Sequence, residues 1–444
     1  MKLALVGQDI PSYLPSMLTD LLQVGHEPAT VCLEEKNGAM QDLLLRYGRV
    51  CFDKANLGGA MHVWPDRREV LRDADVVIYA GDQMASSRFK QDREALMGAS
   101  EDDPGLVDQA RANGGIGWLL HALRQGSQIL PLVQAMREVC PKARVITLGQ
   151  PVARTAYLFH FLGFETYGLA KSVLRGPSGV DGIAGKLGLE LSDLDLLYCG
   201  LPEFAFMYSA NRVKDGADIK DRIEAMASEG ELGRLCRRWY RQYEAVAVGS
   251  VTDHAAFMEA QEDYEPEADP QLSESVEHRK NRILHMNTAG EKGLSDPDGM
   301  IAQLSLLTRT SPLRPVQLAL ALVRGEDLMM DGVTHINAGD LLGLPRDSMV
   351  ETRLVLHKGQ MVPQKLRLSP EITDLMCEID EANRWAAHAA TGDRSALREY
   401  VETDPALAGL DRLYLMDVVN ALIRMHEDIL TQFSQDEDED DDLY

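Results

Sequence analysis

A neutral amide and a primary amine stand directly after two consecutive strand-like segments. Gln150 follows the apolar run Val145–Leu148, and Lys171 follows the short run Glu165–Leu169. A helical segment that starts after a proline, Ala153–Leu162, lies between them, so the stretch predicts one strand–helix–strand crossover of a parallel sheet. Because ligands bind at the carboxyl ends of strands in such sheets, we expect both side chains to face one cleft.

A carboxylate follows a third strand-like run further along the chain. Glu203 comes after Leu194–Gly200 and could hold Lys171 by a charge-assisted hydrogen bond. An ammonium group placed in this way can stabilise the oxygen of an enolate. A Lys–Glu pair can equally be an inert ion pair that fills a cleft. The residues by themselves therefore leave a catalytic and a structural interpretation open.

The first strands of the chain predict the opening of a dinucleotide-binding unit. Gly7 ends the first apolar strand, and Glu34 ends the second, where its carboxylate could accept hydrogen bonds from ribose hydroxyls. The usual glycine fingerprint is absent, because Gln8 and Asp9 follow Gly7. We therefore expect NAD to bind more weakly than at a fingerprint site. A strand–helix–strand unit without any cofactor is the alternative.

Two more glycines and two arginines are candidates for contacts with cofactor or substrate. Gly81 caps the buried strand-like run Asp75–Ala80, and Arg88 lies in the polar segment after it. Gly115 opens a long helix through Arg124, with a second helix expected after a proline. Glycines at a helix start let backbone N–H groups approach a phosphate or carboxylate. Arg88 and Arg124 could each bind a ribose, a phosphate or a sugar carboxylate. For Gly115, the alternative is a plain helix start without a ligand.

Several short pieces, taken in order, resemble the family 4 glycoside hydrolases over about residues 1–433. The pieces are Gly114-Gly115-Ile116, Cys140-Pro141, Gln150-Pro151, Asn337-Ala338-Gly339 and Gly343–Glu351. The resemblance implies an α/β fold with a Rossmann-like, lactate/malate-dehydrogenase-like parallel-sheet domain, residues 1–165. It also implies a mixed α/β C-terminal catalytic domain, residues 166–433. The acidic run at the end of the sequence predicts a disordered tail, residues 434–444.

The resemblance further implies a glycosidase that works through elimination, unlike the usual two-carboxylate enzymes. In such enzymes bound NAD+ takes a hydride from C3 of the sugar, and the resulting ketone acidifies the proton on C2. A tyrosine removes that proton, a metal ion stabilises the enediolate, and the leaving group departs from C1. Water then adds and the hydride returns.

Two metal-ligand positions of the family are changed in this chain. The family pattern G-L-C-H-S stands here as Gly168–Ser172, so Ala170 replaces the ligand cysteine. Glu203 replaces the ligand histidine of the pattern G-L-N-H. Because a methyl group cannot coordinate a metal, we predict no tight Mn²⁺-type site, and we expect Lys171 to supply the missing positive charge. Gln150, still an amide, replaces the family's asparagine as a substrate ligand.

Five further residues are candidates by their position in the family. Tyr240 and Tyr243 lie in an arginine-rich stretch that would favour the phenolate and lower a phenol's pKa, and aromatic residues on a helix face are the alternative. Asp253 and His254 form an acid–histidine pair that could assist the leaving group. Asn337 ends a strand beside the expected cleft. We therefore expect Lys171, Glu203, Tyr243 and Asp253 in catalysis, and Gln150, Arg124, His254 and Asn337 in substrate binding.

Composition excludes some classes of partner. The 444 residues carry a formal net charge of −25, which argues against nucleic acid or an anionic membrane as the main partner. The six scattered cysteines are typical of a reduced, cytoplasmic protein. We expect a small-molecule glycoside as the partner and, as in relatives, a homodimer or homotetramer. The alternative function is a non-catalytic sugar- or nucleotide-binding relative that has lost the metal site.

Overall fold

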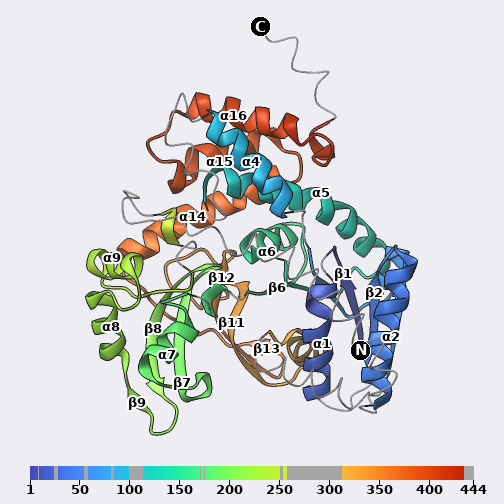
Figure 1. Cartoon of the computed structure of the whole chain (residues 1–444), viewed down its shortest axis with the longest axis horizontal. Coiled ribbons are helices and arrows are strands. Elements are labelled where there is room, and N and C mark those ends of the chain that lie inside the picture. The colour runs from blue at the N-terminus through green and yellow to red at the C-terminus, as the bar shows by residue number, and fades with distance from the viewer. Residues whose placement is uncertain are drawn as a thin grey trace.

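The computed structural model is organised around one large mixed sheet (Figure 1). It describes residues 1–8, 10–24, 29–54, 59–81, 85–99, 114–149, 151–170, 172–174, 176–250, 254–257 and 313–434. Within these residues the sheet has thirteen strands, with the main order β10-β8-β7-β12-β11-β6-β5-β4-β1-β2-β3, while β13 pairs with β12 and β9 pairs with β8.

The N-terminal half of the sheet is parallel throughout, in the order β3-β2-β1-β4-β5-β6. This is the doubly wound dinucleotide-binding order, and its direction of winding reverses between β1 and β4. Its strands are short apolar runs because helices cover both faces. The strands are β1 (Lys2–Val6), β2 (Ala29–Glu34), β3 (Gly59–Trp64), β4 (Val76–Tyr79), β5 (Arg144–Thr147) and β6 (Thr166–Leu169).

The rest of the sheet is antiparallel and continues directly from β6. Val333 and Thr334 of β11 pair with Leu169 and Gly168 of β6, so the sheet runs without a break across the predicted boundary at residue 165. The Rossmann-like and mixed α/β halves are confirmed, while the boundary itself stays a prediction. The strands are β7 (Leu194–Leu201), β8 (Phe204–Arg212), β9 (Ala217–Asp218), β10 (Ala247–Val248), β11 (Leu328–Ile336), β12 (Met349–His357) and β13 (Gln360–Met361).

Two helical layers cover the parallel half of the sheet. One face carries α1 (Ile10–Val24), α2 (Gly38–Lys54) and α13 (Pro315–Arg324). The other face carries α3 (Arg67–Leu71), α5 (Gly115–Val139) and α6 (Val152–Phe161), on which α4 (Ala85–Ala99), α14 (Pro370–Ala389), α15 (Arg394–Thr403) and α16 (Arg412–Met425) pack. The remaining helices flank the antiparallel half: α7 (Val180–Leu187), α8 (Lys220–Glu229) and α9 (Arg234–Tyr243). Short 3-10 turns lie at Ser172–Leu174, Leu191–Asp193, Pro405–Leu407 and Thr431–Phe433.

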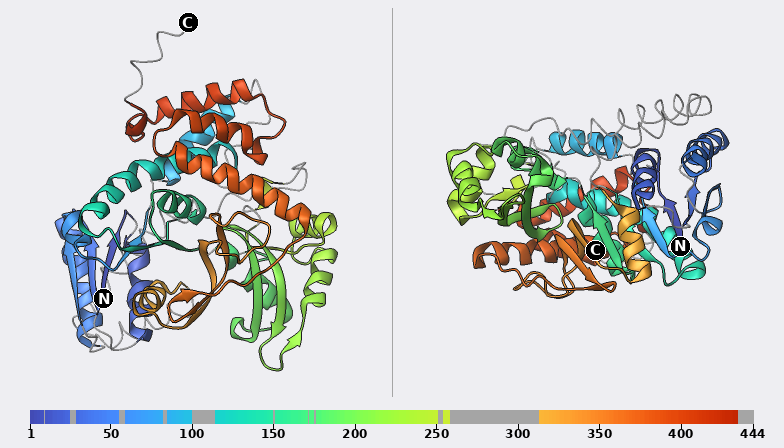
Figure 2. Two further views of the ribbon diagram at one scale, coloured as in Figure 1. Left: turned by 180° about the vertical axis from the view of Figure 1, so that it is seen from behind. Right: turned by 90° about the horizontal axis from the view of Figure 1, so that it is seen from below.

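Helix α13 brings a segment from late in the chain back to the first helix. The carboxylate of Asp20 in α1 accepts hydrogen bonds from the backbone N–H groups of Val316 (2.7 Å) and Gln317 (3.1 Å). It thereby satisfies two of the free N–H groups at the start of α13. The two helices lie side by side on the same face of the parallel strands (Figure 2).

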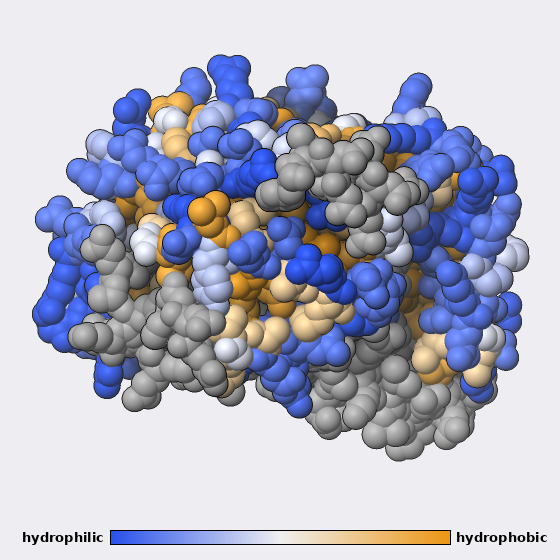
Figure 3. Space-filling view, turned by 90° about the horizontal axis from the view of Figure 1, so that it is seen from above, coloured by the Kyte–Doolittle hydropathy of each residue, from blue (hydrophilic) through white to orange (hydrophobic). Residues whose placement is uncertain are grey.

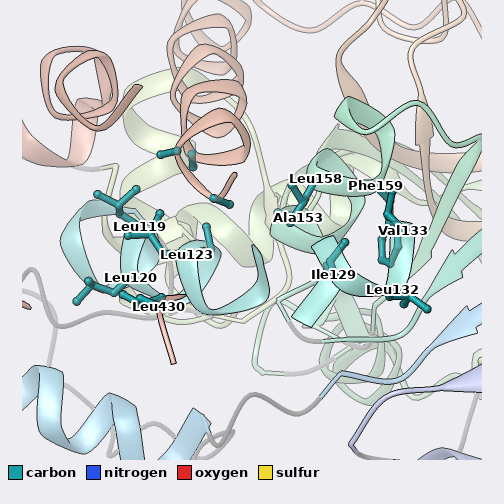
Figure 4. Close-up of a cluster of buried hydrophobic side chains, with 14 of the residues drawn as sticks. Leu119, Leu120, Leu123, Ile129, Leu132, Val133, Ala153, Leu158, Phe159 and Leu430 are labelled. Atoms are coloured by element: carbon teal, nitrogen blue, oxygen red, sulfur yellow. The ribbon is translucent and has the colours of Figure 1, made fainter. Parts of the chain in front are cut away.

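Helix α5 differs from its sequence-based expectation. It runs as one helix from Gly115 to Val139 and passes through Pro131, where two helices were expected. Its residues pack against α6 and the C-terminal helices in a continuous apolar cluster that includes Leu119, Leu123 and Leu430 (Figure 4). This packing offsets the backbone hydrogen bond that the proline removes.

The outer surface agrees with the charged composition. Seen from the side of the C-terminal helices, it is mostly hydrophilic, with hydrophobic residues in small patches (Figure 3). None of the helices in the described ranges is long and apolar enough to cross a membrane.

Candidate functional site

A row of five paired residues, three of them with polar side chains, crosses the sheet where its two halves meet. Thr147, Gly168, Thr334, Glu351 and Gly200 are paired in register across β5, β6, β11, β12 and β7. Both threonines and the glutamate are fully buried. Residues paired in this way project from the same face of the sheet. The row is therefore a polar strip inside an otherwise apolar core.

The first turn of α6 covers this strip. A Cβ atom on Gly168 would lie 2.3 Å from Cγ1 of Val152, so the glycine allows the helix to approach the sheet. The Oγ1 atoms of Thr147 and Thr155 lie 2.6 Å apart and tie β5 to the same helix. A helix N-terminus favours negative charge because of its unpaired N–H groups and its dipole.

Glu203 folds over the strip from the turn between β7 and β8. Its Oε1 accepts a hydrogen bond from Val152 N (3.2 Å), and its own backbone N–H donates to Oε2 of Glu351 (3.1 Å). Its φ of +64° is a left-handed conformation that non-glycine residues seldom adopt. Both carboxyl groups are buried. Glu203 thus connects the β7–β8 turn, the start of α6 and strand β12.

The two carboxyl groups have unusual electrostatics. Burial raises the pKa of Glu203 to about 7, although the positive charge of Arg154 opposes the shift. Burial also raises the pKa of Glu351 to about 8, and the neighbouring charge of Glu203 adds to this effect. Among the described residues, Oε2 of Glu203 and Oε1 of Glu351 have no hydrogen-bond partner. A pair of buried carboxyl groups that titrates near neutral pH is a candidate site for proton transfer.

Arg154 is the buried cation of this site. It lies on α6, is only 4% exposed, and its guanidinium carbon sits 3.4 Å from the centroid of the Trp118 ring. Burial lowers its pKa, while Tyr400 and the carboxyl group of Glu203 oppose the shift. Arg154 and Glu351 are not among the site residues predicted from the sequence. The available signal was a charged residue inside the apolar helical run Val152–Phe161.

Three predicted site residues lie outside the residues that the structure describes. They are Gln150, Lys171 and Asp253. The expected pairing of Lys171 with Glu203, and the shared cleft of Lys171 and Gln150, therefore stay predictions. Ala170 is described and is buried at the end of β6.

An aromatic cluster lies directly beside Glu203. Phe204 packs edge-on against Trp239 with ring centroids 5.6 Å apart, and Tyr243 stacks on Trp239 at 5.1 Å. His254 is buried in the same cluster with Nε2 3.0 Å from the carbonyl oxygen of Ala205. Burial lowers the pKa of His254 to about 4, so its ring is neutral near pH 7.

The tyrosines of α9 differ in part from expectation. The arginine-rich sequence predicts a lowered phenol pKa, but the pKa of Tyr240 is raised by burial and by the charges of Glu224 and Glu244. The prediction is therefore wrong for Tyr240. The hydroxyl of Tyr243 accepts a hydrogen bond from Nε2 of Gln242 (3.0 Å). A catalytic role for Tyr243 stays a prediction.

The predicted cofactor residues occupy the ends of the parallel strands. Gly7 has a φ of +124°, and a Cβ atom there would lie 2.2 Å from the carbonyl oxygen of Ala80. The close approach of β1 to β4 therefore requires a glycine, and Gly81 lies buried in the same corner. The carboxylate of Glu34 at the end of β2 accepts two hydrogen bonds from Nε of Arg67 (2.9 and 3.1 Å).

The remaining predicted residues have partners within the fold. The N–H of Gly115 donates to Asp404 (2.7 Å) at the start of α5. Arg124 is 1% exposed and pairs with Asp92 (2.8 Å), and Arg88 pairs with Asp428. The side-chain amide of Asn337 bonds backbone groups between residues 341 and 345. These contacts explain each residue structurally, and their roles toward cofactor or substrate stay predictions.

Part of the chain is similar to a known family of enzymes. Residues 12–166 match the model of the family 4 glycosyl hydrolases. The chain is 23% identical over 395 residues to the probable 6-phospho-β-glucosidase of Bacillus subtilis (strain 168), covering 86% of this chain and 85% of the relative. It is 24% identical over 236 residues to the α-galactosidase of the same organism, covering 51% of each chain.

Solved structures share the fold over nearly the whole chain. The 6-phospho-β-glucosidase of Thermotoga maritima superposes with a TM-score of 0.73 at 15% identity, covering 96% of this chain and 99% of the other. A 6-phospho-α-glucosidase from gut microorganisms, solved with NAD and Mn²⁺, gives a TM-score of 0.69 at 14% identity, covering 96% of this chain and 98% of the other.

Proposed function

We propose, on the premise that the chain is related to the family 4 glycosyl hydrolases, that it hydrolyses a small glycoside by NAD-assisted oxidation and elimination. The observation that carries the proposal is the buried carboxyl pair of Glu203 and Glu351 beside Arg154, at the start of α6. It lies where the parallel cofactor half of the sheet meets the antiparallel half. The names of the relatives support 6-phosphoglycosides as the first substrates to test.

The ends of the parallel strands fit a dinucleotide. The winding of the sheet reverses between β1 and β4, the place where such sheets bind their ligands. Gly7 allows the close backbone approach there, and Glu34 stands at the end of β2. Bound NAD+ would supply the hydride acceptor of the reaction. In this structure Glu34 holds Arg67, so a ribose would compete with an existing ion pair. We therefore expect NAD to bind, but less tightly than at a site with the full glycine fingerprint.

A divalent metal does not fit the residues at the family's ligand positions. Ala170 offers a methyl group, and one oxygen of Glu203 already accepts the N–H of Val152. The described residues contain no group of three His, Cys, Asp or Glu side chains that could hold a metal ion. The fixed positive charge beside Glu203 belongs to Arg154. We propose that Arg154 is a positioning residue, which helps to keep Glu203 ionised and in place.

The proposal also includes a cellular compartment and an oligomeric state. The free thiols of the described chain, at Cys32, Cys140, Cys199, Cys236 and Cys377, fit the reducing environment of the cytoplasm. A homodimer or homotetramer is the expected assembly, which light scattering after size exclusion would test. The non-catalytic binding alternative is not favoured, because the relatives that the chain matches bear the names of enzymes.

The proposal is tested with p-nitrophenyl glucosides and galactosides, each with and without a 6-phosphate. We expect release of nitrophenol that depends on added NAD+ and incorporation of deuterium at C2 in D2O. Metal analysis of protein purified without chelator should find no stoichiometric transition metal. Protein stripped of nucleotide is the matched control. Absence of both cleavage and exchange with every glycoside would leave the protein as a binding relative, and stoichiometric manganese at Glu203 would refute the metal-free site.

A further inference from the structure

Helix α9 turns an arginine-lined face away from the protein core. Arg234, Arg237, Arg238 and Arg241, together with Gln242, line a cavity of about 570 Å³. Their spacing of three and four residues places the four arginines on one side of the helix. Trp239, which is fully buried, marks the opposite side. We call these four residues the α9 arginine face.

Three of the four arginines of this face, Arg234, Arg237 and Arg241, have no carboxylate partner within the described residues. Like charges three and four residues apart on a helix repel each other and destabilise it. Elsewhere arginines pair with carboxylates, as Arg353 does with Asp195 at 2.5 Å. In the part of the chain that the structure describes, Arg234, Arg237 and Arg241 form no ion pair. The Nε atom of Arg237 is buried and has no hydrogen-bond partner there.

Composition does not account for this concentration of charge. The whole chain has 70 acidic and only 45 basic residues, so a run of four arginines on one helical face goes against the average. Guanidinium groups bind phosphate oxygens through paired N–H donors, which lysines cannot reproduce. The cavity volume is within the range of sites for small molecules.

We propose that the α9 arginine face binds a small molecule that carries a phosphate group. The geometry requires only the negatively charged group and its oxygen acceptors, so the rest of the ligand can differ. The phosphate could belong to a free phosphorylated metabolite or to a phosphorylated sugar. This inference does not rest on glycoside hydrolysis, because it follows from the charge and shape of α9 alone.

Isothermal titration calorimetry with pyrophosphate and with glucose 6-phosphate tests the proposal on the full chain. We expect saturable binding of at least one of them, weakened roughly tenfold or more in the variant Arg237→Gln/Arg241→Gln. The control is Arg46→Gln/Arg49→Gln on α2, which removes the same charge at the opposite side of the molecule (Figure 1) and should leave binding unchanged. Binding of pyrophosphate would show that the site recognises the phosphate group itself. If glucose 6-phosphate binds and pyrophosphate does not, the site also contacts the sugar.

The proposal is overturned if neither compound binds, or if the α9 and α2 variants weaken binding equally, since equal loss means general charge attraction. Should the double variant unfold, the single variant Arg241→Gln decides, because its side chain is exposed. Roughly threefold weaker binding is then the expected result. Unchanged binding in a folded Arg241→Gln protein would contradict the proposal. Circular dichroism and thermal unfolding establish the folded state of every variant.

Discussion

Individual buried charges define the candidate site at the residue scale. Glu203 and Glu351 lie far apart in the sequence but share a hydrogen bond through the backbone N–H of Glu203. Each would be more easily charged in water, so the folded protein holds its proton more tightly than the unfolded chain does. The start of α6 and Arg154 limit this penalty but do not remove it. Burial of the two carboxyl groups therefore lowers the free energy of unfolding at neutral pH and brings their pKa values close to 7 and 8.

The first prediction concerns the pH dependence of stability. The folded-state pKa values, about 7 for Glu203 and about 8 for Glu351, exceed the ordinary value of 4.5, so the folded protein binds these protons more tightly than the unfolded chain does. The stabilisation that comes from this tighter proton binding is complete below pH 4.5, and it is lost as the pH rises through 7 and 8. Glu351→Gln should therefore stabilise the protein by about 1–3 kcal/mol near pH 8.5 and change it little near pH 4.5. Urea unfolding at both pH values measures this difference.

The matched control for this prediction is Glu378→Gln, since the side chain of Glu378 is exposed on α14. Its effect on the free energy of unfolding should be small and the same at both pH values. An identical effect of Glu351→Gln at the two pH values would show that Glu351 does not titrate abnormally.

At the scale of elements, helix α5 connects the sheet to the C-terminal helices. It passes so close to the end of α14 that a Cβ atom on Gly126 would lie 1.9 Å from the carbonyl oxygen of Ala390. The same helix packs against α6 (Figure 4). Helix α6 carries Arg154 and the N–H group that binds Glu203. The position of α5 therefore influences the position of the candidate site.

The second prediction tests this close contact between helices. Gly126→Ala should destabilise the protein by about 1–3 kcal/mol, because the added methyl group overlaps a backbone atom that cannot move freely. Gly185→Ala in α7 is the control, since a Cβ atom there meets nothing within 4 Å. That change should stabilise the protein by about 0.5–1 kcal/mol, because alanine is the better helix former. Equal effects in urea unfolding would mean that α5 and α14 are further apart than the structure shows.

At the scale of the whole molecule, the two halves of the chain are interleaved. Helix α13 lies against α1, and the C-terminal helices α14–α16 share an apolar cluster with α5 and α6. Leu119 and Leu123 are fully buried in this cluster. The continuous sheet adds a third connection, through the pairing of β6 with β11.

The third prediction follows from this interleaving. A fragment of residues 1–165 should not fold cooperatively, because it would expose the apolar surfaces of α1, α5 and α6 to water. We expect dye binding typical of exposed apolar surface and no sharp thermal transition by circular dichroism, with the full chain measured in parallel. A cooperative transition with native-like near-ultraviolet signals would instead establish residues 1–165 as an independent domain.

The sequence by itself determined those features that depend on neighbouring residues. The apolar runs of β1, β2, β4, β5 and β7, and the crossover through α6, follow from local hydrophobic patterns and from glycine and proline positions. The order of the motifs also predicts that Ala170 and Glu203 stand at metal-ligand positions of the family, and this stays a prediction. Such signals act over a few residues, so the rest of the fold does not change them.

Only the tertiary structure decided which side chains meet. Glu203 contacts Glu351 and Val152, although the three come from a turn, a strand and a helix that are distant in sequence. Glu34 was expected to bind a ribose, but its carboxylate binds Arg67. The pairing of β3 with β2 places Trp64 beside Glu34, and Arg67 follows three residues later at the start of α3. Strand register and helix packing set these partners, and both depend on contacts across the whole chain. A local pattern can therefore place a charged group at a strand end, but not identify the group that it binds.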